Sequence, residues 1–195
     1  MKTWAENQPD VMLLDQDESW FSRFKQPKLH SFAEKDAPLR LVERQAKPQE
    51  PDQAIACLGA RCHQTKERFF FFADGQPNTA IMIRMLSALL VIATARHKRV
   101  LVIIWDRATW HQSKRLKSWV WHHNQQAKRE PNGVRLLLCL LPTKSPWLNP
   151  MEPIWMHVKR KVAEPDGDLS VKVLKQRLCA IFDTTLQKAS LQLSD

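Results

Sequence analysis

Apolar runs separated by polar segments predict several β-strands in the first part of the chain. Val11–Leu14 leads into an acidic cluster, where we expect the first strand to end. Ala54–Gly59 and Arg68–Ala73 predict two more strands, and the second of these contains four consecutive phenylalanines. Residues 35–53 are rich in charge, proline and glutamine and predict hairpin or loop, with room for one short strand at Leu39–Val42.

The second part of the chain alternates helices with strands. Thr79–Ala95 predicts a helix with Asn78 or Thr79 as its N-cap, and Val100–Trp105 predicts a strand buried on both faces. A basic amphipathic helix, a strand and two further helices are expected at Ser113–Arg129, Val134–Leu141, Pro150–Ala163 and Leu169–Leu186. Strands that are first antiparallel and later joined by helices predict a mixed α/β sheet.

Composition restricts the chain to a few classes of protein. With 195 residues and 44 % hydrophobic side chains, it is long enough for one domain with a buried core. Its longest apolar stretch, Thr79–Ala95, is too short for a membrane span and contains Arg84. Residues 1–10 are polar and lack a secretory signal, and the four cysteines form no CxxC pair. We therefore expect a cytoplasmic protein with neither a disulfide framework nor a zinc ribbon.

Positive charge is concentrated in the later part of the sequence. Residues 1–60 contain 8 basic and 10 acidic side chains, whereas residues 61–195 contain 22 and 10. Within Arg96–Lys161 there are 14 basic residues and only three acids. Such a basic surface favours a polyanionic partner, most often nucleic acid, although basic faces that only contact solvent are the alternative.

Two aspartates lie near predicted strand ends. Asp106 directly follows the strand Val100–Trp105, and the carboxyl ends of strands border the ligand-binding crevice in α/β sheets. Asp17 lies at or just past the expected end of the first strand. Asp106 could instead cap the following loop, and Asp15 or Glu18 could take the place of Asp17.

Glu152 lies at a predicted helix N-terminus, where Asn149 fits the N-cap and Pro150 the first helical position. The partial positive charge of the helix end keeps this carboxylate ionised, as a metal ligand must be. A capping-box role for Glu152 is the alternative. Together, the three carboxylates suit hard divalent cations such as Mg²⁺ or Mn²⁺, and two such ions can cleave a phosphodiester.

The segments around these acids resemble the motifs of one transposase family. Val102–His111 is similar to the second-aspartate motif of the mariner-like bacterial insertion-sequence transposases, which are DDE superfamily endonucleases. Leu141–Trp155, with its string SPWLNPME, closely resembles their third-acid motif. Asp17–Arg23 is similar to the first motif, which selects Asp17 over its acidic neighbours. The resemblance extends from about residue 11 to residue 182.

This resemblance implies an RNase H-like fold, an α/β architecture with a mixed five-stranded sheet flanked by helices. It implies a DDE triad of Asp17, Asp106 and Glu152 that binds two Mg²⁺ or Mn²⁺ ions, hydrolyses DNA at transposon ends and transfers the 3′-hydroxyl end into target DNA. His111 and Asn149 are expected to support the site. The expected partner is double-stranded DNA, with a homodimer as an option and no membrane. The basic residues expected to contact DNA are Arg107, Lys114, Arg115, Lys144, Lys159, Arg160 and Lys161.

The chain departs from the family in two ways. Arg107 stands where the family usually has Asn, and the first motif lies too near the start for the usual N-terminal helix-turn-helix region. We therefore expect a single catalytic domain over residues 1–195. The alternatives are a non-catalytic remnant that binds DNA or dimerises with an intact transposase, and a related RNase H-like nuclease that only hydrolyses.

Overall fold

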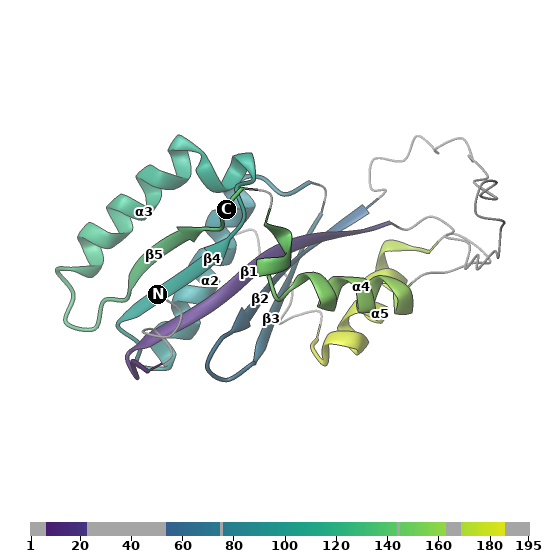
Figure 1. The fold of residues 1–195 in the computed structure, drawn as a ribbon, viewed down its shortest axis with the longest axis horizontal. Coiled ribbons are helices and arrows are strands. Elements are labelled where there is room, and N and C mark those ends of the chain that lie inside the picture. The colour runs from purple at the N-terminus through teal and green to yellow at the C-terminus, as the bar shows by residue number, and fades with distance from the viewer. Residues whose placement is uncertain (1–6, 23–53, 75, 144, 163–168, 186–195) are drawn as a thin grey trace.

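The protein is described by a computed structural model over residues 7–22, 54–74, 76–143, 145–162 and 169–185 (Figure 1). Its described strands form one five-stranded sheet in the order β3-β2-β1-β4-β5. The strands are β1 (Val11–Ser22), β2 (Ala54–Cys62), β3 (Arg68–Asp74), β4 (Val100–Trp105) and β5 (Arg135–Leu140). β1–β2 and β2–β3 are antiparallel, whereas β1–β4 and β4–β5 are parallel. The predicted mixed sheet is confirmed.

Helices cover the two faces of this sheet. One face carries α2 (Thr79–Ala95), the short 3-10 helix η1 (Thr109–Gln112) and α3 (Lys114–Ala127). The other carries α4 (Glu152–Val162) and α5 (Val171–Phe182), and the 3-10 turn η2 (Pro146–Leu148) precedes α4. Because side chains alternate between the two faces of a strand, each strand contributes to both layers.

The phenylalanine run in β3 illustrates this alternation. Phe69 and Phe71 pack in the core beneath α2, whereas Phe70 and Phe72 pack in the core beneath α4 and α5. Burial of the run on both faces explains why it contains no polar interruption. α2 begins as predicted, since the Asn78 side chain accepts hydrogen bonds from the two backbone N–H groups of Ala80 and Ile81.

The first strand is longer than its apolar run predicts, and the expected end in the acidic cluster is wrong, because β1 continues to Ser22. β1 pairs with β4 only as far as Asp15, but β2 supplies antiparallel partners from Leu14 to Ser22. These partners satisfy the backbone of the acidic stretch, which therefore stays in the sheet. Asp17 consequently lies in the middle of the strand, directly opposite Gly59, and not at a strand end.

The other predicted elements are found with small shifts. α2 and β4 have the predicted bounds, while α3, α4 and α5 are each shorter than predicted at both ends. α4 starts at Glu152, because the preceding residues form a turn in which the Glu152 N–H donates to the carbonyl of Asn149 (3.3 Å). The predicted loop 35–53, with its strand Leu39–Val42, lies outside the described residues. No helix among the described residues is long and apolar enough to cross a membrane.

Candidate active site

Asp17, Asp106 and Glu152 line one cavity of about 370 Å³. They come from the middle of β1, the residue after β4 and the first residue of α4. The structure therefore brings together three acids that are distant in the sequence. The remaining lining residues are Arg107, Ala108, Leu141, Pro142, Thr143, Ser145 and Asn149.

Asp17 is an acid in an unfavourable environment. Burial, reinforced by the nearby negative charges of Glu18 and Glu152, raises its pKa from 3.8 to about 7. The indole Nε1 of Trp155 donates to Asp17 Oδ2 (2.9 Å) and counteracts this shift only in part. Asp17 is thus held in place by α4 but is not neutralised by any of these neighbours.

A glycine on the neighbouring strand makes room for this contact. Gly59 lies opposite Asp17, and a Cβ on it would lie 2.4 Å from Met151 Cε and 2.7 Å from the Trp155 ring. Any larger residue would therefore force Met151 and the Trp155 ring, which lie at the start of α4, to shift. Gly59 therefore sets how closely the helix that carries Glu152 and Trp155 approaches Asp17.

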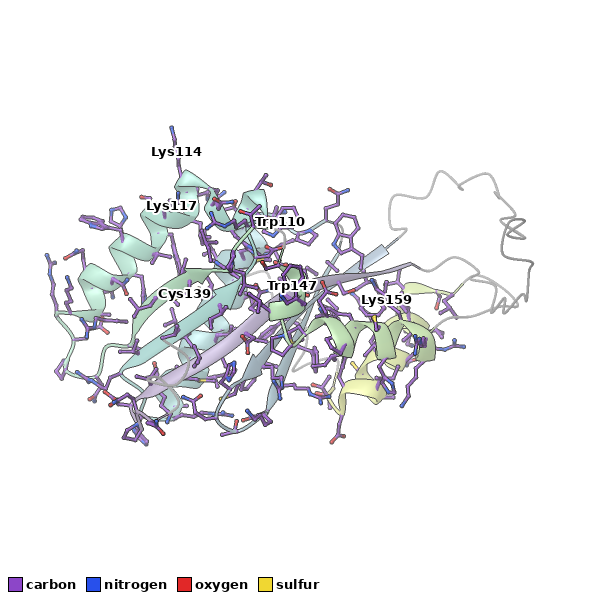
Figure 2. The ribbon with its side chains drawn as sticks, viewed as in Figure 1. Trp110, Lys114, Lys117, Cys139, Trp147 and Lys159 are labelled. Atoms are coloured by element: carbon purple, nitrogen blue, oxygen red, sulfur yellow. The ribbon has the colours of Figure 1, made fainter. Side chains whose placement is uncertain are left out.

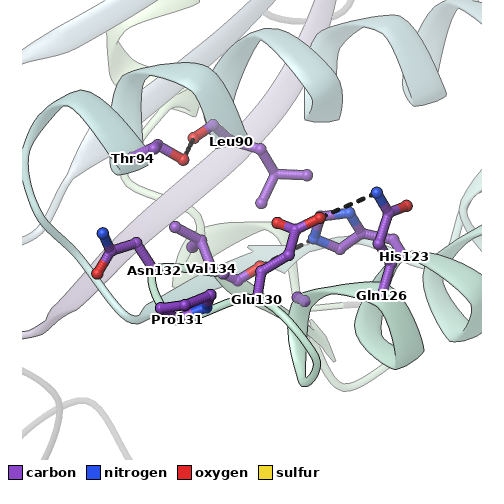
Figure 3. Close-up of a pocket in the computed structure, with 10 residues that line it drawn as sticks. Leu90, Thr94, His123, Gln126, Glu130, Pro131, Asn132 and Val134 are labelled. Atoms are coloured by element: carbon purple, nitrogen blue, oxygen red, sulfur yellow. Dashed lines mark hydrogen bonds between the residues drawn. The ribbon is translucent and has the colours of Figure 1, made fainter.

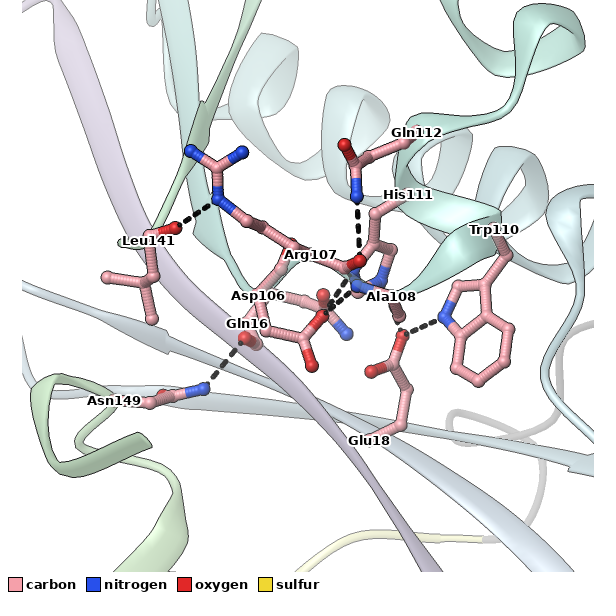
Figure 4. A network of polar contacts seen from close by, with 10 residues as sticks. All are labelled: Gln16, Glu18, Asp106, Arg107, Ala108, Trp110, His111, Gln112, Leu141 and Asn149. Carbon is pink, nitrogen blue, oxygen red and sulfur yellow. Dashed lines mark hydrogen bonds and ion pairs between the residues drawn. The ribbon is translucent and has the colours of Figure 1, made fainter. Parts of the chain in front are cut away.

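Asp106 is held by a different set of donors (Figure 4). Its Oδ1 accepts hydrogen bonds from His111 Nδ1 (2.7 Å) and from the Ala108 backbone N–H (2.9 Å). The hydrogen bond from His111 is the main reason why the pKa of Asp106 is lowered. Asp106 therefore remains ionised at neutral pH, which contrasts with Asp17.

His111 connects Asp106 to a second carboxylate, that of Glu18. Its Nε2 lies 2.8 Å from Glu18 Oε1, which also accepts from Trp110 Nε1 (3.2 Å). Burial alone would lower the pKa of His111, but the hydrogen bonds to the two carboxylates outweigh it and raise the pKa to about 9. His111 is one of the predicted supporting residues, whereas the sequence predicts Glu18 only as an alternative to Asp17 and not as a partner of His111. The available signal was the position of Glu18 next to Asp17, which points it to the opposite face of β1.

Asn149 fixes the start of α4 relative to β1. Its side-chain oxygen accepts from the Met151 N–H (3.1 Å), and its amide Nδ2 donates to the carbonyl of Gln16 (3.2 Å). The helix starts two residues later than predicted, so Pro150 is not its first residue and Asn149 closes the turn before α4 instead of capping the helix itself. The bond to β1 adds a link that the sequence did not indicate. Glu152 lies at the helix N-terminus as predicted, and it is exposed to the cavity rather than folded back into a cap.

Of the predicted DNA contacts, only Arg107 lines the cavity among the described residues. Its Nε donates to the carbonyl of Leu141 (2.9 Å), which fastens the arginine to the loop after β5 (Figure 4). The other described basic residues are exposed, in the first turn of α3 and the last turn of α4: Lys114, Arg115, Lys159, Arg160 and Lys161. Figure 2 shows Lys114 and Lys159 on well-separated parts of the surface. Lys144 lies outside the described residues.

The donor types in the cavity fit a hard divalent cation. Carboxylate oxygens are the ligands that Mg²⁺ and Mn²⁺ prefer, and a cation would offset the burial and the repulsion that raise the pKa of Asp17. Within the described ranges, no group of three His, Cys, Asp or Glu side chains is close enough together to hold a metal ion. The three acids therefore share a cavity without forming a closed metal cage.

A second cavity, of about 400 Å³, lies between the ends of α2 and α3 (Figure 3). Its polar side chains bond to each other and to the backbone: His123 Nε2 to the Val134 carbonyl (2.9 Å), and Gln126 to Glu130 (3.0 Å). None of the predicted site residues lines this second cavity.

Comparison with known proteins agrees with this geometry. The sequence profile of the DDE superfamily endonucleases matches residues 12–168. The chain belongs to this family. All three acids of the cavity fall within the matched segment. A search of curated proteins finds no match.

Solved structures of a mariner transposase share the fold of this chain. The Mos1 mariner paired-end complex with Mn has a TM-score of 0.58 at 15 % identity, covering 89 % of this chain and 48 % of the other. The Mos1 paired-end complex with Mg has a TM-score of 0.55 at 16 % identity, covering 91 % and 50 %. These matches confirm the RNase H-like fold. The chain spans about half the length of the Mos1 chains.

Proposed function

We propose that this chain is the catalytic domain of a DNA transposase, in which Asp17, Asp106 and Glu152 bind two Mg²⁺ or Mn²⁺ ions. The observation that supports this proposal most directly is that the three acids line one cavity although they come from three separate elements. The family match spans all three, and the solved complexes of similar fold contain transposon DNA.

Each acid has a separate part in this chemistry. Asp106 enters the reaction ionised because His111 lowers its pKa, and Glu152 faces the same cavity from the first turn of α4. Asp17 becomes an anion when a cation compensates for its burial. Bound divalent ions would activate the attacking oxygen and stabilise the leaving oxygen of the phosphodiester. Water is the attacking group in end cleavage, and the freed 3′-hydroxyl is the attacking group in strand transfer.

The exposed basic residues suit a phosphate backbone. Lys114 and Arg115 occupy the first turn of α3, which contains no acid, although the positive helix end disfavours cations there. A phosphate bound at this turn would compensate both the side-chain charges and the helix dipole. Trp147 in η2 is 75 % exposed next to cavity-lining residues, so it offers a ring on which a base can stack.

Plasmid nicking by the full chain tests the proposal. With Mn²⁺ or Mg²⁺ we expect nicking that is lost with a chelator and falls more than about 100-fold in Asp106→Asn and Glu152→Gln, beyond the usual loss for a residue that only supports a ligand. Glu130→Gln, in the second cavity, is the matched control and should retain activity.

A pre-cut 3′ end separates the transposase from its alternatives. Joining of this end to target DNA is expected for a transposase, whereas nicking without joining would identify a nuclease that only hydrolyses. DNA binding without nicking in either metal would identify a non-catalytic remnant and contradict the proposal.

A further inference from the structure

A single buried imidazole joins Glu18 to Asp106 (Figure 4). His111 lies 2.7 Å from Asp106 through Nδ1 and 2.8 Å from Glu18 through Nε2, and its side chain is 0 % exposed. Its ring stacks on Trp105 with a centroid distance of 4.1 Å and an interplanar angle of 10°. With both nitrogens bonded and one face covered, the ring has little freedom to rotate.

This bridge determines which oxygen of Asp106 is available. His111 and the Ala108 N–H both bond to Oδ1, so the carboxylate is fixed about that atom and its other oxygen is left for the cavity. Asp106 itself is 53 % exposed and follows the last residue of β4. Without the bridge, such an exposed side chain would sample several rotamers.

We propose that Glu18 is a positioning residue that orients Asp106 through His111. The inference rests on the proposed function, because it assigns Glu18 a part in the same site. Two consecutive residues of β1 would then contribute to the cavity, Asp17 as one of its acids and Glu18 as the residue that orients Asp106. Asp17 lines the cavity from one face of the sheet, and Glu18 reaches Asp106 from the other.

Simple core packing does not account for Glu18. Its side chain is 6 % exposed, and a buried carboxylate is costly unless donors satisfy it. Two ring N–H groups, of His111 and Trp110, converge on its Oε1. An apolar residue would pack at this place without that requirement, but it would leave Nε2 of His111 without an acceptor.

Three substitutions distinguish the hydrogen bond between His111 and Glu18 from the charge of Glu18 and from the packing of the His111 ring. Glu18→Gln keeps an oxygen that accepts from Nε2, Glu18→Leu removes it, and His111→Phe keeps a ring on Trp105 but removes both hydrogen bonds. We expect Mn²⁺ affinity of the full chain, measured by electron paramagnetic resonance of free Mn²⁺, to fall about 10–100-fold in the Leu and Phe variants. Glu18→Gln should remain within about threefold of wild type.

His123→Phe is the matched control. This histidine also stacks on a tryptophan, Trp119, and bonds through Nε2 to the Val134 carbonyl, but it lines the second cavity. Its substitution should leave Mn²⁺ affinity unchanged. Melting temperatures of all variants identify any loss that is due to unfolding alone.

Proton NMR of the metal-free chain tests the bridge directly. We expect two slowly exchanging ring N–H signals from His111, both lost in His111→Phe and one lost in Glu18→Leu. Absence of these signals from the wild type, or equal Mn²⁺ affinity in Glu18→Gln and Glu18→Leu, would overturn the inference and leave the proposed function standing. A wild-type chain that shows the signals but binds no Mn²⁺ would instead overturn the proposed function, and the positioning role with it.

Discussion

Asp17 and Asp106 line the same cavity but are held in opposite ways. Asp17 is embedded in the central strand of the sheet beside two other acids, and its pKa is raised to about 7. Asp106 is half-exposed after the end of β4, and its pKa is lowered by the hydrogen bond from His111. Local partners, rather than membership of one cavity, therefore set the charge of each acid.

The site has two supporting structures, which we call the α4 side and the η1 side. On the α4 side, Trp155 bonds to Asp17, Asn149 bonds to β1 just before Glu152, and Gly59 leaves room for the Trp155 ring. The η1 side holds Asp106. At neutral pH, Asp106 is charged whereas Asp17 is only partly ionised. We expect Asp17 to release its proton when a cation enters the cavity.

The largest expected effect is on the free energy of unfolding, which Asp17→Asn should raise and Asp106→Asn should lower. Between pH 3.8 and about 7, folded Asp17 keeps a proton that the unfolded chain releases, so the stability contribution of this group falls as pH rises. Asp17→Asn removes this penalty and should raise the free energy of unfolding at pH 8 by about 4 kcal/mol. Asp106→Asn should lower it, because the ionised carboxylate stabilises the fold above its own unfolded pKa.

Urea denaturation with a chelator at pH 8 and pH 3 measures both effects. At pH 3 the gain from Asp17→Asn should vanish, since the wild-type carboxyl is protonated in both states. An Asp17→Asn variant that is less stable than wild type at pH 8 would contradict the opposed environments of the two acids.

Two glycines provide the next comparison. Gly59→Ala would push Met151 and Trp155 away from the sheet, and Gly133→Ala would place a Cβ 2.1 Å from the carbonyl oxygen of Ala127 at the end of α3. Each should cost about 2 kcal/mol of unfolding free energy through overpacking. Only Gly59→Ala should also weaken Mn²⁺ binding and DNA nicking. Equal activity of the two folded variants would show that the approach of α4 to Asp17 does not matter.

Two asparagines give a smaller and sharper contrast. Asn149 bonds to Gln16 and Met151 on the α4 side, while Asn124 makes two bonds to the backbone of Leu136, far from the acids in the sequence. Substitution of either by alanine should cost about 1–2 kcal/mol. Nicking per folded molecule should fall only in Asn149→Ala. If both variants keep wild-type activity, the link between α4 and β1 serves stability alone.

The α4 side of the site shows what could and could not be predicted from the sequence. Asn149 and Glu152 were identifiable because the signals for a helix start depend on a few adjacent residues, even though the helix begins two residues later than predicted. The length of β1 was not, because the polar residues after Leu14 are kept in the sheet by β2, which is distant in the sequence. Tertiary pairing here overrides the local pattern.

On the η1 side the same limit applies to side chains. The position of Asp106 after β4 followed from the apolar run before it. Its connection through His111 to Glu18 joins residues 93 positions apart and depends on how η1 packs against the sheet. Spacing along the sequence contains no information on such a contact, so Glu18 was visible only as a neighbour of Asp17.

The smallest expected effect comes from Glu67, a carboxylate outside the cavity. Its contribution to the loss of stability at low pH can be compared with that of Asp106. Glu67 forms a two-bond pair with Arg96 (2.7 Å each), and the hydrogen bond from this arginine lowers its pKa. Its contribution is therefore present above its unfolded pKa and disappears as pH falls through the folded one. The side chains of Arg96 and Glu67 are 34 % and 43 % exposed, so solvent screens the pair. Glu67→Gln should therefore cost less than about 1 kcal/mol at pH 7 and nothing at pH 2, by urea denaturation. If the free energy of unfolding of wild type and of Glu67→Gln falls equally as pH is lowered, the loss is due to Asp106 and other carboxylates and not to Glu67. Asp17 acts in the opposite direction, because its raised pKa makes its contribution more favourable at low pH.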